Sequence, residues 1–239
     1  MGSTMSEWHL FTLLGLGFLL GLRHALDADH VAAVSAILAR SDSLWRSSLI
    51  GACWGLGHTV VLLAAGVVVL GFKVAIPPAL SQGFEFAVGL MLVGLGLSLG
   101  WTLWREDWHW HRHEHDGTHH VHLHHHHHGQ EHRHLHWLDG GLKPFFVGMM
   151  HGLAGSAALL LVVVSAVDNV AQGLIYIVMF GFGSVCGMVV VGLLVSWPLV
   201  HAEAWGPVAR LSVRGLVSLG TVLVGVWTMI ETGVLAALF

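Results

Sequence analysis

The stretch GLRHALDADHVAAV, from Gly21 to Val34, places ionisable side chains inside an apolar run that begins at Trp8. An ionisable side chain in a membrane span costs about 2.5–3.5 kcal/mol on insertion scales, so such residues are read as functional. Within seven residues the stretch holds two imidazoles and two carboxylates, from His24, Asp27, Asp29 and His30. Both groups are ligands of divalent metals. The stretch therefore predicts a metal site inside a membrane helix, and a proton relay or an ion pair with Arg23 is the alternative.

The chain as a whole has the composition of a polytopic membrane protein. Of its 239 residues, 55% are hydrophobic and only 10% are charged, and the mean hydropathy is +0.73. These values exclude an ordinary soluble domain. The two cysteines, Cys53 and Cys186, lie in separate apolar runs and imply no disulfide framework. The N-terminal apolar run lacks a basic leader, which favours a retained helix over a cleaved signal.

Six apolar segments are long enough to cross a bilayer, for which a helix needs about 20 residues. They cover residues 8–38, 47–72, 84–104, 142–167, 171–198 and 208–236. We therefore expect an all-α protein with six transmembrane helices. The first segment is long for one span, so it must tilt or be interrupted near the histidines and aspartates.

The first three segments resemble the last three in order, which indicates an internal repeat. Gly21-Leu-Arg-His24 aligns with Gly148-Met-Met-His151, Gly55-Leu-Gly57-His58 with Gly181-Phe-Gly183-Ser184, and the glycines Gly89 and Gly94 with Gly220 and Gly225. Three spans per half give the halves opposite orientations, so we expect a 3+3 inverted repeat with a site at the bilayer midplane. The repeats would cover residues 1–104 and 141–239. Chance matching of glycines in an apolar background is the alternative.

The distribution of basic residues predicts the orientation. The first, third and fifth connections carry Arg40 and Arg46, then Arg105, Arg112, Arg133 and Lys143, then Arg210 and Arg214. The connections on the opposite side carry Lys73. Because cytoplasmic loops are enriched in Lys and Arg, we expect these three connections in the cytoplasm and both termini outside the cell (inner) membrane.

The connection over residues 105–140 is rich in histidine. It holds fifteen of the 21 histidines in the chain. This segment is too polar to span a membrane and too biased in composition to pack a core, so we expect a disordered loop. Imidazole-rich tracts bind Ni²⁺, Zn²⁺, Co²⁺ and Cu²⁺ with little discrimination. The loop is therefore interpreted as a cytoplasmic metal reservoir.

Helical geometry relates the candidate ligands to one another. At 3.6 residues per turn, His24, Asp27 and His30 share one face, whereas Asp29 lies about 140° from His24. Either Asp29 has a separate role or the helix unwinds and turns it inward, which is permitted where a broken helix lines a polar cavity.

Two further histidines join the candidate site from other spans. His58 lies near the middle of the second span, and His151 occupies the repeat position of His24. In the second half Asp27, Asp29 and His30 are replaced by Ala154, Ser156 and Ala157. The predicted metal residues are His24, Asp27, Asp29, His30, His58 and His151, although a lone histidine can equally be a hydrogen-bonded core residue.

These motifs resemble those of the nickel/cobalt transporter (NiCoT) family. The family pattern Arg-His-Ala-x-Asp-Ala-Asp-His is matched by residues 23–30, and its Leu-Gly-His-Ser/Thr motif by Leu56-Gly-His-Thr59. Residues 147–158 resemble the short branch of urease-accessory-type nickel permeases. The chain departs from eight-helix members in lacking their first helix and an Asp-Thr-Ala-Thr-Glu stretch. The resemblance implies secondary uptake of Ni²⁺ or Co²⁺ for metalloenzymes such as urease.

We therefore expect a secondary uptake permease for Ni²⁺, with Co²⁺ second. No cofactor or catalytic residue is predicted, because the chain has no nucleophile motif, and it has no G-x-x-x-x-G-K-[ST] signature of an ATP-driven pump. An exporter of the same fold is the first alternative, followed by a zinc transporter and by a membrane-bound metal chaperone or metalloenzyme. The expected partners are a divalent metal ion and the lipid bilayer, without nucleic acid, and a cytoplasmic metal acceptor is compatible with this role.

Overall fold

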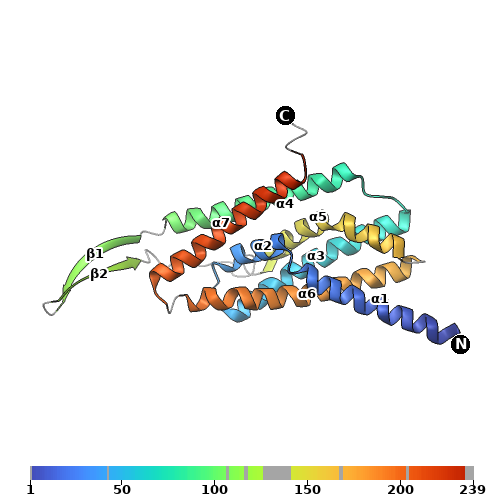
Figure 1. Cartoon of the computed structure of the whole chain (residues 1–239), viewed down its shortest axis with the longest axis horizontal. Helices are drawn as coiled ribbons and strands as arrows, with labels where there is room; N and C mark the ends of the chain where they lie inside the picture. Colours follow the sequence, from blue (N-terminus) through green and yellow to red (C-terminus); the bar gives the residue numbers. More distant parts are fainter. Residues whose placement is uncertain are drawn as a thin grey trace.

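The computed structural model describes residues 2–41, 43–105, 108–115, 118–125, 141–166, 169–202 and 205–234, and seven helices make up the body of this part of the chain. The helices lie along one another in an elongated bundle (Figure 1). They are α1 (Gly2–His24), α2 (Ala28–Leu38), α3 (Leu44–Phe72), α4 (Pro78–Arg105), α5 (Lys143–Ala166), α6 (Val170–His201) and α7 (Pro207–Glu231). The helical body agrees with the expected fold class.

Four of these helices, α3, α4, α6 and α7, are long and apolar enough to cross a membrane. Residues Phe11–His24 and Ala28–Leu38 form a bent pair that passes the same criterion together, which brings the number of spans among the described residues to five if the pair is one span. The sequence predicts six. Helix α5 occupies the predicted fourth segment, but the side chains of residues 156–166 lie outside the described part, so this span stays a prediction.

The helices pack in a regular pattern of pairs. Helix α3 packs against α6 and α4 against α7, while α1 lies on α6 and α5 lies on α3. Gly51 approaches Met188, and one turn further along α3 Gly55 approaches Val185, so α3 and α6 run in opposite directions. The short helix α2 fits between α7, α6 and α4. It therefore lies inside the bundle, with Ala33 and Val34 fully buried.

Glycine is required where these helices touch. A Cβ atom at Gly21 would collide with the carbonyl group of Phe180 on α6, and one at Gly148 would collide with that of Trp54 on α3. Close approach of backbones through small residues is how membrane helices gain packing contacts without a hydrophobic driving force. These contacts hold α1 against α6 and α5 against α3.

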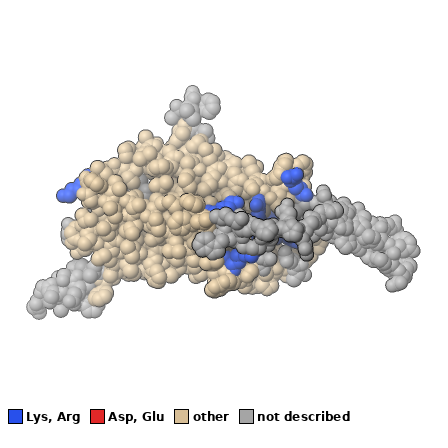
Figure 2. Space-filling model, turned by 180° about the vertical axis from the view of Figure 1, so that it is seen from behind, with Lys and Arg blue, Asp and Glu red and all other residues tan. Residues whose placement is uncertain are grey.

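The surface of the bundle is largely apolar. Figure 2 shows one face on which uncharged side chains predominate and the visible charged groups are Lys and Arg. Large hydrophobic side chains such as Leu216, Trp227 and Trp104 are mostly exposed. A contiguous apolar surface of this kind belongs in lipid.

Two antiparallel strands follow α4, where the sequence predicts a disordered loop. Strands β1 (Trp108–His115) and β2 (Thr118–His125) pair with Trp108 opposite His125 and His115 opposite Thr118, and the ribbon projects from the bundle (Figure 1). Histidine alternates with other residues along β1, and a period of two suits an extended strand. The strands cover residues 108–115 and 118–125 of the predicted loop, residues 126–140 lie outside the described part, and the disorder of the loop stays a prediction.

Candidate metal site

The helix that carries the motif is broken at residues 25–27. Helix α1 ends at His24, α2 begins at Ala28, and the two are bent by 56°. In the break, the amides of Leu26 and Asp27 donate to the carbonyls of Arg23 and His24 at 2.9 and 3.0 Å, three residues back instead of four. Asp27 is extended, with φ −62° and ψ 145°, before α2 resumes. Of the two expectations for the long first segment, interruption is the one that the structure adopts.

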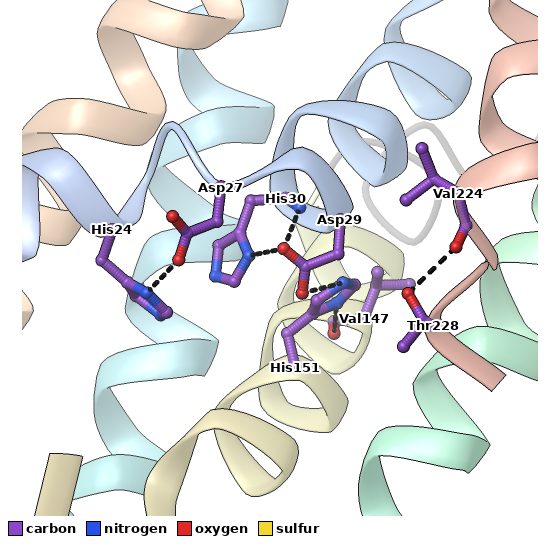
Figure 3. A network of polar contacts seen from close by, with 8 residues as sticks. All are labelled: His24, Asp27, Asp29, His30, Val147, His151, Val224 and Thr228. Carbon is purple, nitrogen blue, oxygen red and sulfur yellow. Dashed lines mark hydrogen bonds and ion pairs between the residues drawn. The ribbon is translucent and has the colours of Figure 1, made fainter. Parts of the chain in front are cut away.

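Four histidine rings converge beside this break. The ring centroids of His24 and His30 are 4.4 Å apart, and that of His58 lies 5.2 and 5.3 Å from these two. The ring of His151 lies 5.1 Å from that of His30. The four side chains come from α1, α2, α3 and α5, and Figure 3 shows three of them around the break. His30, His58 and His151 are buried, so His58 does not face lipid.

Both aspartates face histidines. The carboxylate oxygen Oδ2 of Asp27 accepts a hydrogen bond from Nδ1 of His24 at 2.8 Å (Figure 3). Oδ1 of Asp29 accepts from both the main-chain amide and the ring Nδ1 of His30, at 2.9 and 2.8 Å, and its Oδ2 lies 3.9 Å from Nε2 of His151. The break thus turns Asp29 into the cluster, which a continuous helix would not do.

Several buried ring nitrogens have no hydrogen-bond partner among the described residues. They are Nε2 of His30, both nitrogens of His58, and Nε2 of His151, whose Nδ1 lies 3.2 Å from the carbonyl of Val147. A buried polar atom without a partner costs about 1–3 kcal/mol and calls for an explanation. Unpartnered imidazole nitrogens on neighbouring rings can bind a ligand between them.

The donor atoms fall into two groups that are compact enough for one metal ion. His24, His30 and His58 form one, and Asp29, His30 and His151 form the other, with all ligand atoms of a group within 4.8 Å of one another. His30 belongs to both groups. Of the six predicted residues, only Asp27 lies in neither group, although it contacts His24. The alternative partner Arg23 is exposed, and the described residues include no ion pair between it and either aspartate.

Aromatic side chains line the cluster, and they were not among the residues predicted from sequence. The indole of Trp54 stacks on His58, with ring centroids 5.4 Å apart and planes inclined by 10°, and its centroid lies 4.7 Å from that of His30. Phe180 on α6 lies 5.3 Å from His24. The sequence does carry a signal for Trp54, because it precedes His58 by four residues and so shares its helical face.

This arrangement defines a class of protein: a multi-pass membrane protein with an imidazole-rich cluster at a broken helix inside the bundle. A family model described as "NicO: High-affinity nickel-transport protein" matches residues 10–192. The chain therefore belongs to this nickel transporter family, and it is a transporter and not an enzyme.

The chain is 37% identical over 237 residues to the "Urease accessory protein UreH" of Bacillus sp. (strain TB-90), a match that covers 98% of each chain. No solved structure matches. The expected resemblance to nickel transporters is thus confirmed.

Proposed function

We propose that this protein is a secondary permease that carries Ni²⁺ into the cell, with Co²⁺ as a second substrate, through the cluster of His24, Asp27, Asp29, His30, His58 and His151. The observation that carries the proposal is the set of buried, unpartnered ring nitrogens of His30, His58 and His151. Imidazole suits Ni²⁺, Co²⁺, Zn²⁺ and Cu²⁺, and family membership selects nickel among these. The relative in Bacillus sp. is named a urease accessory protein, and this name favours a role in metal supply, and hence uptake.

We propose further that the two halves form a 3+3 inverted repeat. Under the sequence alignment, Trp54 corresponds to Phe180 and Phe18 to Phe145. The close approach of Gly21 to Phe180 then has its equivalent in that of Gly148 to Trp54. The approach of Gly57 to Phe145 likewise has its equivalent in that of Gly183 to Phe18.

The helix packing supports the same proposal. In the proposed repeat, the contact between α1 and α6 is equivalent to the contact between α5 and α3. Helix α3 is equivalent to α6, and α4 to α7, and the two helices of each of these pairs pack against each other. Chance matching of glycines would not pair these contacts. The second half lacks the carboxylates, so the ion would lie off the pseudo-two-fold axis, towards His24 and Asp29.

The proposed orientation places the basic connections and the His-rich segment in the cytoplasm and both termini outside. Arg40, Arg105 and Lys143 lie at or next to the ends of α2, α4 and α5. In Figure 1, α1 begins and α7 ends away from the end of the bundle where the ribbon projects, which favours this orientation. The proposed direction of transport is then towards the face that carries the ribbon.

Flux of ⁶³Ni into proteoliposomes of known orientation tests the function. His58→Ala is the most direct variant, because neither ring nitrogen of His58 has a partner to lose, and we expect it to abolish flux. His201→Ala is the matched control, since His201 is an exposed histidine on α6 whose Nδ1 bonds the carbonyl of Trp197 at 2.8 Å. Wild-type flux through His58→Ala would refute the assignment of the site. Flux only away from the cytoplasmic face would favour the exporter.

A further inference from the structure

The hydrogen bonds of His24 and His30 give the two nitrogens of each ring different tasks. A carboxylate without a proton can only accept, so Nδ1 of His24 donates to Asp27 and Nδ1 of His30 donates to Asp29. The neutral ring then has its lone pair on Nε2. In His30 this Nε2 is buried and has no partner in the described part of the chain. Each of these two imidazoles is therefore oriented from one side and free to bind from the other.

We propose that the transported ion is held by three imidazoles, Nε2 of His24, Nε2 of His30 and a ring nitrogen of His58, and that Asp27 and Asp29 orient these ligands without coordinating the ion. This inference rests on the proposed function and deepens it. Metal-bound histidines commonly donate their other N–H to a carboxylate, which fixes the tautomer and raises the basicity of the ligand. The pairs Asp27–His24 and Asp29–His30 have this relation.

The spacing of the donors is compatible with this seat. One donor atom from each of His24, His30 and His58 lies within 4.8 Å of the others. Metal–nitrogen bonds of about 2.0–2.1 Å place donor atoms roughly 3.0–3.4 Å apart, so donors within 4.8 Å of one another need at most a modest contraction on binding. Trp54 stacked on His58 and the carboxylates behind the other two rings limit where the rings can turn.

The competing seat consists of Asp29, His30 and His151. In that seat Asp29 would both orient His30 through Oδ1 and bind the ion through Oδ2. In the three-imidazole seat these two tasks fall on different residues. His151 then lies beside the seat, where its Nε2 is 3.9 Å from Oδ2 of Asp29.

An all-nitrogen seat has a consequence for selectivity. Mg²⁺, Ca²⁺ and Mn²⁺ prefer oxygen ligands, whereas Ni²⁺, Co²⁺, Zn²⁺ and Cu²⁺ accept imidazole. With the carboxylates withheld from the ion, abundant oxygen-seeking cations find no ligand set that suits them. The seat therefore selects the chemical class of the substrate, borderline divalent transition metals.

Nickel X-ray absorption on the full-length protein tests the proposal, because multiple scattering counts the imidazoles bound to Ni²⁺. The measurement uses a background in which the histidines between 109 and 136 are replaced by Gln, so that loop histidines do not contribute. We expect three imidazoles in this background, two in His24→Ala, His30→Ala and His58→Ala, and three in His151→Ala. Loss of an imidazole in His151→Ala but not in His24→Ala would assign the ion to the competing seat and overturn the proposal.

The aspartates are tested by graded substitution. An Asn side chain can still accept the Nδ1–H bond, so Asp27→Asn and Asp29→Asn should keep three imidazoles and bind Ni²⁺ roughly tenfold more weakly, and the Ala variants up to about 100-fold more weakly. A lost oxygen ligand in Asp29→Asn, with unchanged imidazoles, would make Asp29 a direct ligand. Flux with a different ligand set would overturn this inference alone, whereas a folded background that neither binds nor transports Ni²⁺ would overturn the proposed function too.

Discussion

Gly152 on α5 offers a way to disturb the cluster without touching any of its side chains. A methyl carbon at this position would lie 2.8 Å from the carbonyl oxygen of His58 and 3.3 Å from its Cα. Ordinary van der Waals contact begins at 3.4 Å, so α3 and α5 must separate by about 0.6 Å (3.4 Å less 2.8 Å) at the point where His58 is anchored. A binding constellation tolerates a displacement of only about 0.5 Å. We therefore expect Gly152→Ala to move His58 out of register with His24 and His30.

The expected magnitude follows from two opposing effects. Overpacking of this kind costs about 1–3 kcal/mol, and the better helix propensity of Ala offsets up to about 1 kcal/mol. A net cost of about 1.4 kcal/mol that falls on the bound position of His58 weakens Ni²⁺ binding about tenfold. Gly152→Ala should therefore have both a lower melting temperature in detergent and a higher Ni²⁺ concentration at half-maximal ⁶³Ni flux.

Gly94→Ala is the matched control for this variant. Gly94 is an exposed helical glycine on α4, and a methyl group there would meet nothing within 4 Å. The control should have wild-type flux and unchanged or higher stability, by up to about 1 kcal/mol from helix propensity. If Gly152→Ala matches the wild type in both measurements, the spacing of α3 and α5 does not set the geometry of the cluster.

Three further predictions follow from other parts of the molecule. Deletion of residues 108–136 should lower the number of Ni²⁺ ions bound per protein in equilibrium dialysis. One tighter site and measurable flux should remain, because the cluster lies elsewhere. Complete loss of flux in a folded variant would make the segment an obligatory relay. Trp54→Phe keeps a ring against His58 and loses no hydrogen bond, so its melting temperature should be close to that of the wild type. Trp54→Ala leaves a cavity that lowers the free energy of unfolding by about 3–5 kcal/mol, so its melting temperature should be clearly lower. Equal melting temperatures of the two variants would contradict a packing role. In a background without Cys53 and Cys186, a membrane-impermeant maleimide should label Ser3→Cys in intact cells and Arg112→Cys only after lysis, and the reverse pattern would invert the proposed orientation.

Much of the local chemistry was predictable from sequence alone. The ionisable residues within the first apolar segment indicated a functional site, because such groups are costly in lipid. The excess length of that segment predicted a tilt or an interruption, and the chain is broken at residues 25–27. The motifs around His24, His30 and His58 led to the nickel transporter family, to which the chain belongs. Each of these inferences uses only neighbours along the chain.

The rest depended on contacts between distant segments. A regular helix places Asp29 about 140° from His24. The 56° bend between α1 and α2 changes this relation, so that the ring of His24 and the carboxylate of Asp29 both lie beside His30. The pairing of β1 with β2 is likewise a contact between two segments, and composition alone does not contain it. The distance between His24 and His58, and the stacking of Trp54, follow from how closely α1, α3, α5 and α6 approach through glycine. That approach is decided by which backbones meet across the bundle, a property of pairs of helices that the spacing of residues within one helix does not contain.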